Sequence, residues 1–321
     1  MYEDVKNEVK QSLFEADRVA ITTDGWTSCS TEGYVTITAH LINKEWAMQN
    51  LVLQTRVLNE SHTGINIGGL LRDAGQEWNI TDKSPALVTD NARNMILAGR
   101  AAEFSPHIPC FAHTLNLASQ KAMRVNSADQ LLGRVRKVVS FFHQSPLATN
   151  LLREKQRLLA LPQHKLKTDV CTRWNSSCEM LERFLEQQAA VEATLMSKDF
   201  RKGEEANTLK DCDISNAEDV VQLMTPIKMA TTVMCEEQQP TVSVIAPLKA
   251  KLLSHLKPNE DDSAIVKEMK NVMVKDLSDR YSDVNDSLYK ASALDPRFKE
   301  LPFTEFEERE CTYAKVAVEA V

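Results

Sequence analysis

The sequence of 321 residues lacks several signals that would place it in a familiar class. No run approaches the roughly 18 apolar residues of a membrane-spanning helix, and no apolar signal-peptide core follows Met1. The seven cysteines are odd in number and scattered, which argues against a disulfide framework and favours a reducing compartment. Gly-rich phosphate loops, Gly-x-Ser-x-Gly elbows and His-Glu-x-x-His motifs are absent too. We therefore expect no membrane contact and no small-molecule substrate.

Charge is distributed unevenly along the chain. The net charge of −7 argues against a general nucleic-acid binder. One region, residues 121–173, nevertheless has eleven Lys and Arg against three acidic residues, so it carries +8 and the remainder −15. This basic region predicts contact with DNA phosphates, with Arg134, Arg136 and Lys137 as candidate contacts. Ordinary solvated helix faces are the alternative explanation of the same charges.

The first third of the chain has the apolar pattern of an α/β domain. Apolar and polar residues alternate in successive short runs that turn residues separate, which predicts an antiparallel meander. A helix and one further strand then follow. The expected strands are 18–23, 34–42, 46–58 and 86–89, and the expected helices are 2–17, 61–78 (capped by Ser61) and 91–102. The pattern therefore predicts a mixed sheet with strands near 18–58 and 86–90.

Two aspartates, Asp24 and Asp90, each follow a short apolar run and precede a small polar turn. If a right-handed crossover places strand 86–89 parallel beside strand 18–23, both carboxylates reach the same edge of the sheet, where α/β proteins bind ligands. Because paired carboxylates hold magnesium in many enzymes, we expect a possible Mg²⁺ site at Asp24 and Asp90. This order of elements is typical of the ribonuclease-H-like arrangement. Capping of the following turn or helix is the structural alternative for each aspartate.

From about residue 110 the apolar spacing is almost entirely helical. The expected helices begin at Ser127 and Ser215 and also cover 146–160, 175–196, 243–257, 263–281 and 304–319. The polar stretch 198–213 is the expected loop or boundary. We therefore predict an α/β plus all-α protein, with an incomplete ribonuclease-H-like core at 1–109 and a mostly helical insertion region at 110–321.

Two short motifs in the helical region contain residue types that bind ligands. Cys110 and His113 share one helix face and could support a site or contact DNA, although a buried Cys beside a hydrogen-bonded His is an equal alternative. Two ligands do not complete a zinc site, so we expect no structural zinc. Arg173 and Trp174 place a guanidinium beside an indole, which suits a phosphate and a stacked base. A core Trp next to a surface Arg is the alternative.

Six motifs in a fixed order carry a family resemblance that covers about residues 18–300. They are Asp24-Gly25-Trp26-Thr27-Ser28, His62-Thr63-Gly64-x-Asn66-Ile67, Val88-Thr89-Asp90-Asn91-x-x-Asn94-Met95, Cys110-x-x-His113-x-Leu115-Asn116, Thr172-Arg173-Trp174-Asn175-Ser176 and Leu294-Asp295-Pro296-Arg297-Phe298-Lys299. In this order the chain resembles the hAT transposases, and above all their domesticated vertebrate relatives, the BED-type zinc-finger proteins.

The resemblance implies a fold and a site. Family members have a ribonuclease-H-like core that a large helical insertion interrupts, and active members cut and rejoin DNA with an Asp-Asp-Glu triad and magnesium. By motif, Asp24 and Asp90 match the two aspartates. Cys110 and His113 match a pair near the active site, and Arg173 with Trp174 match residues that handle the DNA end. The implied chemistry is phosphodiester hydrolysis and transfer between two metal ions.

The chain also departs from the family pattern. The family glutamate lies after the insertion in a segment that carries the dimerisation region, whereas this chain stops at Val321, and the BED finger is missing before the first helix. We therefore expect a truncated, catalytically inactive, nuclear protein that binds DNA and nuclear proteins in transcriptional regulation. One alternative is a part of an active Asp-Asp-Glu transposase, and the other is a helical protein-interaction scaffold.

Overall fold

The computed structural model describes residues 1–170, 173–197, 209–236 and 238–319, which form two compact units. Unit 1 comprises Met1–Thr114, Val233–Ala250 and Arg280–Val321, and unit 2 comprises Leu115–Thr232 and Lys251–Asp279. The expected division after residue 109 lies near the first boundary. It differs from the structure beyond that point, because two later segments return to unit 1. No described helix has both the length and the apolar character needed to cross a membrane.

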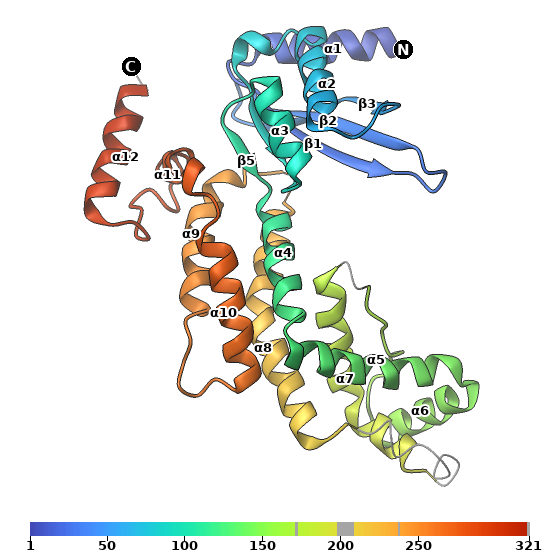
Figure 1. Ribbon diagram of the computed structural model, residues 1–321. Coiled ribbons are helices and arrows are strands. Elements are labelled where there is room, and N and C mark those ends of the chain that lie inside the picture. Colours follow the sequence, from blue (N-terminus) through green and yellow to red (C-terminus); the bar gives the residue numbers. More distant parts are fainter. Residues whose placement is uncertain (171–172, 198–208, 237, 320–321) are drawn as a thin grey trace. The chain divides into compact units, whose positions relative to one another are not determined.

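Unit 1 is built on one mixed sheet with the strand order β3-β2-β1-β4-β5 (Figure 1). The strands are β1 (Ala20–Thr27), β2 (Gly33–Ile42), β3 (Met48–Val57), β4 (Ala86–Thr89) and β5 (His107–Pro109). Pairing is antiparallel for β1 with β2 and for β2 with β3, and parallel for β1 with β4 and for β4 with β5. The predicted mixed sheet is confirmed. Strand β5 was not predicted.

Three helices cover one face of this sheet: α1 (Tyr2–Glu15), α2 (Gly64–Glu77) and α3 (Arg93–Ala102). Alternation along β2 decides which face is covered, because Val35, Ile37 and Ala39 are buried whereas the residues between them are only half-buried. These side chains share one hydrophobic core with residues from all three helices, such as Leu13 and Leu71. The opposite face carries the polar side chains of the strands.

Helices α2 and α3 pack at very close range because α2 has glycines where the helices meet. A Cβ on Gly64 would lie 2.5 Å from the Leu97 Cβ, and a Cβ on Gly68 would lie 2.6 Å from the Ala101 Cβ. The N-cap of α2 is Thr63, whose side chain accepts a hydrogen bond from the Asn66 N–H, and not the predicted Ser61. The close contact fixes α3, which begins just after Asp90.

The remaining described helices follow the predicted spacing with one addition. They are α4 (Phe111–Met123), α5 (Asn126–Gln144), α6 (Pro146–Leu158), α7 (Trp174–Leu195), α8 (Asp211–Met234), α9 (Val242–His255), α10 (Ala264–Ser278), α11 (Asn285–Leu294) and α12 (Phe306–Glu319). Helix α11 was not predicted. Helix α8 starts before Ser215, and most of the expected boundary at 198–213 lies outside the described residues.

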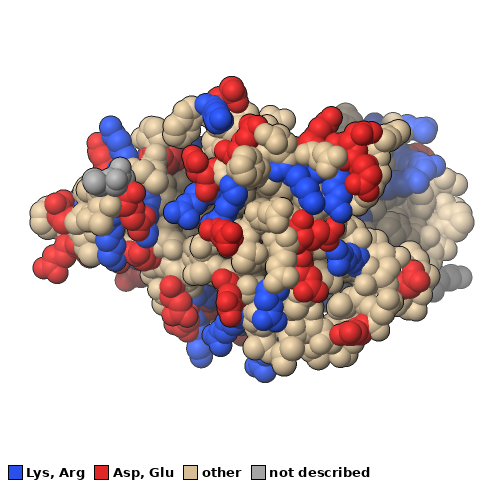
Figure 2. Space-filling model, turned by 90° about the horizontal axis from the view of Figure 1, so that it is seen from above, with Lys and Arg blue, Asp and Glu red and all other residues tan. Residues whose placement is uncertain are grey.

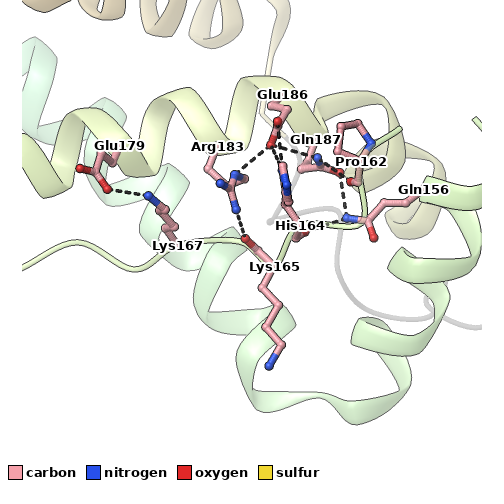
Figure 3. Close-up of polar contacts among 9 residues, drawn as sticks. All are labelled: Gln156, Pro162, His164, Lys165, Lys167, Glu179, Arg183, Glu186 and Gln187. Carbon is pink, nitrogen blue, oxygen red and sulfur yellow. Dashed lines mark hydrogen bonds and ion pairs between the residues drawn. The ribbon is translucent and has the colours of Figure 1, made fainter. Parts of the chain in front are cut away.

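Unit 2 contains a non-helical strap, residues 159–169, between α6 and α7. Three of its backbone carbonyls accept hydrogen bonds from side chains of the two helices (Figure 3). The amide of the buried Gln156 donates to the His164 carbonyl at 2.8 Å, and that of the buried Gln187 donates to the Pro162 carbonyl at 3.0 Å. The Arg183 guanidinium donates to the Lys165 carbonyl at 2.9 Å. These bonds hold the strap in one conformation without regular secondary structure.

The close contact of α2 with α3 predicts opposite effects for two adjacent glycines. Replacement of Gly68 by Ala should lower the free energy of unfolding by about 1–3 kcal/mol, because the new Cβ overlaps the Ala101 side chain. Gly69 has no heavy atom within 4 Å of such a Cβ, so Gly69→Ala should raise stability by about 0.5–1 kcal/mol. Urea denaturation of both variants checks this, and equal stabilities would contradict the packing.

Candidate active site

The two predicted aspartates lie on neighbouring parallel strands. β1 pairs with β4 through Ala20↔Ala86, Ile21↔Leu87 and Thr22↔Val88. Asp24 and Asp90 each stand two residues beyond the last of these pairs, so they occupy equivalent levels on two adjacent chains. Adjacent strands lie about 4.8 Å apart, which brings the two side chains into proximity. In contrast to the prediction, β1 does not end at Asp24 but continues to Thr27 along β2.

Both carboxylates lie on the sheet face opposite to α1, α2 and α3. Ile21 and Thr23 are buried toward the helices, so Asp24, the residue after Thr23, projects to the other side. The same alternation in β4 buries Leu87 and Thr89 and leaves Asp90 on the face of Asp24. Asp24 is exposed and Asp90 is half-buried. The pair is therefore open to a ligand from solvent.

Electrostatics agrees with this proximity. Partial loss of hydration raises the pKa of Asp24, and the negative charge of Asp90 raises it further. The Gly25 N–H and the nearby His113 act in the opposite direction but do not reverse the shift. A bound cation would stabilise the ionised form of a carboxylate whose ionisation a neighbouring negative charge opposes.

Asp90 also has a structural role in the turn that follows β4. Its Oδ1 accepts a hydrogen bond from the Ala92 N–H at 2.9 Å, and Ala92 is the N-cap of α3. The next side chain, Asn91, donates from Nδ2 to the Thr114 hydroxyl at 2.8 Å. Hydrogen bonding to the following turn, the structural alternative for Asp90, therefore applies to its Oδ1 atom. The turn also fixes the direction of the carboxylate.

Cys110 and His113 enter the same site from the start of α4. The Cys110 N–H donates to the Thr89 carbonyl at 2.8 Å, which ties the first turn of α4 to the end of β4. His113 lowers the pKa of Asp24, and burial together with the Asp24 charge raises the pKa of the Cys110 thiol. The structure therefore gathers four predicted residues, Asp24, Asp90, Cys110 and His113. Their roles in the site stay predictions.

Two carboxylates fit part of a magnesium site. Magnesium binds one or two protein carboxylates and keeps several waters, and the mutual repulsion of Asp24 and Asp90 is what a cation would relieve. Within the described part of the chain, no group of three or more His, Cys, Asp and Glu is arranged to hold a metal ion. Asp24 and Asp90 would therefore be the protein ligands of a Mg²⁺ ion, and solvent would supply the remainder.

Two stacked aromatic side chains, Trp26 and Tyr34, lie beside Asp24 and were not predicted as part of the site. Trp26 follows Asp24 by two residues and lies on the same face of β1, and 46% of its surface is exposed. It stacks on Tyr34 of β2, with ring centroids 4.5 Å apart and planes inclined by 12°. Strand register pairs the two residues directly. Such a surface suits a stacked base, and only the motif around Trp26 signalled it in the sequence.

The predicted Arg173–Trp174 pair lies in unit 2 and divides into a surface and a core residue. Trp174 is the first residue of α7 and only 2% exposed, whereas Arg173 before it is exposed. This corresponds to the alternative of a core Trp, because a buried indole offers no face to a base. Arg173 remains a candidate phosphate contact. The neighbouring Thr172 of the motif lies outside the described residues.

Two of the three predicted contacts on α5 are already used in ion pairs. Arg134 pairs with Asp213 at 2.7 Å, and Arg136 holds both oxygens of Asp169 at 2.8–3.1 Å. The Asp169 side chain is 2% exposed. Its burial opposes ionisation, but the hydrogen bonds from Arg136 and Ser177 lower its pKa. The third, Lys137, is exposed and forms no ion pair with another residue that the structure describes.

Comparisons with known proteins identify two family models along the chain. Residues 22–103 match the ZBED1 RNase-like domain, and residues 108–223 match the ZBED1 RNase-like helical domain. The first covers the sheet with Asp24 and Asp90, and the second covers Cys110, His113 and most of unit 2. The two matches follow the strand-then-helix organisation of the structure.

Three relatives show how far the similarity extends. The chain is 30% identical to the human "Zinc finger BED domain-containing protein 4" over 96% of this chain and 27% of that protein. It is 28% identical to the "Putative AC transposase" of Zea mays over 54% of this chain and 23% of that protein. It is 22% identical to the "Putative transcriptional regulator tpeD" of Talaromyces stipitatus over 78% of this chain and 33% of that protein. The chain thus spans a third or less of each of these proteins.

The proximity of the two carboxylates predicts that the charge of Asp90 contributes to the raised pKa of Asp24. Asp90→Asn should lower the pKa of Asp24 toward its ordinary value of 3.8, because it removes the neighbouring negative charge. Carboxyl ¹³C NMR during a pH titration checks this, with the Asp24 signal assigned from Asp24→Asn. The exposed Asp82→Asn serves as the control and should leave the Asp24 titration unchanged.

The same shift has a consequence for stability. A folded-state pKa raised above the unfolded value gives stability that is present below pH 3.8 and is lost as pH rises through the folded pKa. The change in the free energy of unfolding caused by Asp24→Asn should therefore be more favourable at pH 7 than at pH 3. The difference should be about 0.5 kcal/mol or less, because Asp24 is exposed. A pH-independent difference between variant and parent would contradict the coupling.

Proposed function

Because the chain is a relative of the domesticated hAT-type transposases, the BED-type zinc-finger proteins, we propose that it binds DNA in the nucleus as a transposase-derived regulator without performing strand transfer. The observation that carries this proposal is the Asp24–Asp90 pair itself. It keeps two neighbouring carboxylates on an open sheet face, and the part of the chain that the structure describes gathers no third ligand around them.

The physical argument concerns charge at the reacting phosphate. In metal-assisted phosphodiester chemistry a bound cation neutralises the attacking and leaving oxygens. Asp24 and Asp90 can orient such a cation, but two carboxylates, one of them with a raised pKa, bind it weakly. The pair therefore suits cation-assisted contact with a phosphate better than cleavage. His113 and Cys110 line the same site and would shape its access.

The second candidate function is strand cleavage by a larger assembly. It is favoured by the same convergence of Asp24 and Asp90, which preserves the geometry that a triad with a further carboxylate would need. The relatives include a protein described as a transposase. A glutamate supplied from beyond the described residues would complete the site, and the test below distinguishes this case.

DNA contact would use the basic residues of 121–173 that are not engaged in ion pairs. On the face shown in Figure 2, acidic and basic side chains are intermingled, as the net charge of −7 suggests. Arg153, Arg157 and Lys165 are exposed and have no ion pair with another described residue. In Figure 3 the Lys165 ammonium extends away from the contacts of the strap, whereas Lys167 is held by Glu179 at 2.6 Å.

The carboxylate pair predicts weak cation binding without catalysis. Mn²⁺ titration of the purified chain, followed by its electron paramagnetic resonance signal, should show one weak site that Asp24→Asn and Asp90→Asn each weaken about tenfold or more. Asp82→Asn should bind as the parent does. Nicked and blunt-ended duplex DNA incubated with the chain and Mg²⁺ should be neither cleaved nor joined. Cleavage or joining that Asp24→Asn abolishes would support the second candidate and refute inactivity.

The free basic residues predict salt-dependent DNA binding. The logarithm of affinity for duplex DNA should fall linearly with the logarithm of salt concentration, and Arg153→Gln, Arg157→Gln and Lys165→Gln combined should reduce that slope by about 2–3. Fluorescence anisotropy between 50 and 200 mM salt, roughly the range where phosphate contacts dominate, measures it.

A matched triple variant removes the same charge from unit 1. It combines Lys44→Gln, Arg72→Gln and Lys299→Gln, which are also exposed and have no ion pair with another described residue, and we expect it to keep the slope. Arg136→Ala is unsuitable as a probe, because it leaves Asp169 buried without its partner and should destabilise unit 2 by about 2 kcal/mol. Absent or salt-insensitive binding by the parent would instead support the protein-interaction scaffold.

A further inference from the structure

A buried tyrosine from the last part of unit 1 lies under the start of α4. Tyr281 is 5% exposed, and its ring meets the Phe111 ring edge-on with centroids 5.7 Å apart. Its hydroxyl is 2.9 Å from the Thr114 hydroxyl and 3.0 Å from the Pro109 carbonyl oxygen. Phe111 and Thr114 are both fully buried as well. The tyrosine thus enters a dry space directly behind Cys110 and His113.

Counting protons gives this network one direction. The Pro109 carbonyl can only accept, so it takes the single proton of the Tyr281 hydroxyl. The Thr114 hydroxyl must then donate to the Tyr281 oxygen, which leaves the Thr114 oxygen to accept from Asn91 Nδ2 at 2.8 Å. Each group donates to the next, from Asn91 through Thr114 and Tyr281 to Pro109. Bonds aligned in this way strengthen one another.

Both ends of this chain of hydrogen bonds adjoin the candidate active site. Asn91 follows Asp90 directly, and its side chain helps to hold the turn that directs the Asp90 carboxylate. Pro109 precedes Cys110, and Thr114 follows His113. Tyr281 therefore supports, from behind, the two segments that carry the three residues gathered around Asp24, which are Asp90, Cys110 and His113.

The backbone at Tyr281 indicates that this placement is imposed by its surroundings. Its φ of 74° lies in the left-handed region, which a bulky aromatic residue rarely adopts. The Lys249 ammonium lies 5.8 Å from the centre of its ring and donates to the Arg280 carbonyl. Unfavourable local geometry persists where the environment holds a residue firmly, and such positions cluster at functional sites.

We propose that Tyr281 is a positioning residue of the candidate active site, whose hydroxyl acts through Thr114 and Pro109 to hold Cys110 and His113 beside Asp24 and acts through Asn91 to hold Asp90. The inference rests on the proposed role of Asp24 and Asp90. It adds a residue that lies far along the chain and belongs to none of the six sequence motifs.

The test compares two tyrosine-to-phenylalanine variants in unit 1. Tyr281→Phe keeps the ring against Phe111 and removes only the hydroxyl. Tyr313→Phe is the matched control, because its hydroxyl donates to the Lys299 carbonyl at 2.6 Å away from the site. Both variants remove the donor to one backbone carbonyl, and Tyr281→Phe also removes the acceptor of the buried Thr114 hydroxyl. The free energy of unfolding of each variant is therefore measured by urea denaturation, and the readouts below are taken where both are fully folded.

The first readout is the rate at which iodoacetamide alkylates Cys110 in the native protein, resolved by mass spectrometry of its peptide. Cys110 is half-buried with a raised pKa, so it should react slowly in the parent. Tyr281→Phe should raise this rate roughly fivefold, the factor expected for one lost hydrogen bond, and Tyr313→Phe should not. The buried Cys178 monitors unfolding of unit 2 and should stay unmodified throughout.

The second readout is Mn²⁺ binding at Asp24 and Asp90. Tyr281→Phe should weaken it several-fold under conditions in which urea denaturation shows both variants to be fully folded. If the parent binds no Mn²⁺ but Cys110 responds as expected, the proposed cation site fails and the positioning role stands. If Cys110 reacts equally in both variants, or if the parent binds Mn²⁺ and Tyr281→Phe binds it equally tightly, the positioning role is refuted.

Discussion

The parallel pairing of β1 with β4 is the constraint on which the rest of unit 1 depends. Three backbone pairs, from Ala20↔Ala86 to Thr22↔Val88, set the level of one strand against the other. Because side chains alternate along a strand, a shift by one residue would turn Asp90 toward the helices and away from Asp24. The buried faces of Ile21 and Leu87 prevent that shift, since both are fully enclosed in the core. The apolar face thus determines the geometry of the polar one.

The elements around this pair of strands likewise separate packing on the covered face from polar side chains on the open face. On the covered face, the glycines of α2 let α3 approach closely, and α3 in turn fixes the chain that leaves Asp90. On the open face, Asp24 stands next to the Trp26–Tyr34 stack. A charged pair beside an exposed aromatic surface is chemically suited to a nucleic-acid strand, which presents phosphates and unpaired bases together.

The sequence allowed the sheet to be predicted because its strands alternate and its turns contain typical turn residues. The short β5 escaped detection, because three residues ending in Pro109 have no measurable period. The pairing of Asp24 with Asp90 could be predicted from strand order, whereas the continuation of β1 past Asp24 depends on its antiparallel partner β2.

Residues whose role depends on distant contacts were harder to predict. The dipeptide Arg173–Trp174 reads the same whether its indole is buried or exposed, and packing of α7 buries it. Arg134 and Arg136 looked available as cations until the structure placed Asp213 and Asp169 beside them. Tyr281 meets Thr114 across 167 positions of sequence, and no local pattern signals such a contact.

The one-way order of hydrogen bonds from Asn91 to Pro109 has an evolutionary consequence. A hydroxyl lost at 281 leaves the Pro109 carbonyl without its donor and the Thr114 proton without its acceptor, both in a space that water does not reach. A second change at 114, to an apolar residue of similar shape, would remove one of these two defects. Positions 91, 114 and 281 are therefore expected to drift together among descendants of the same ancestor, as a single inherited character and not as three separate ones.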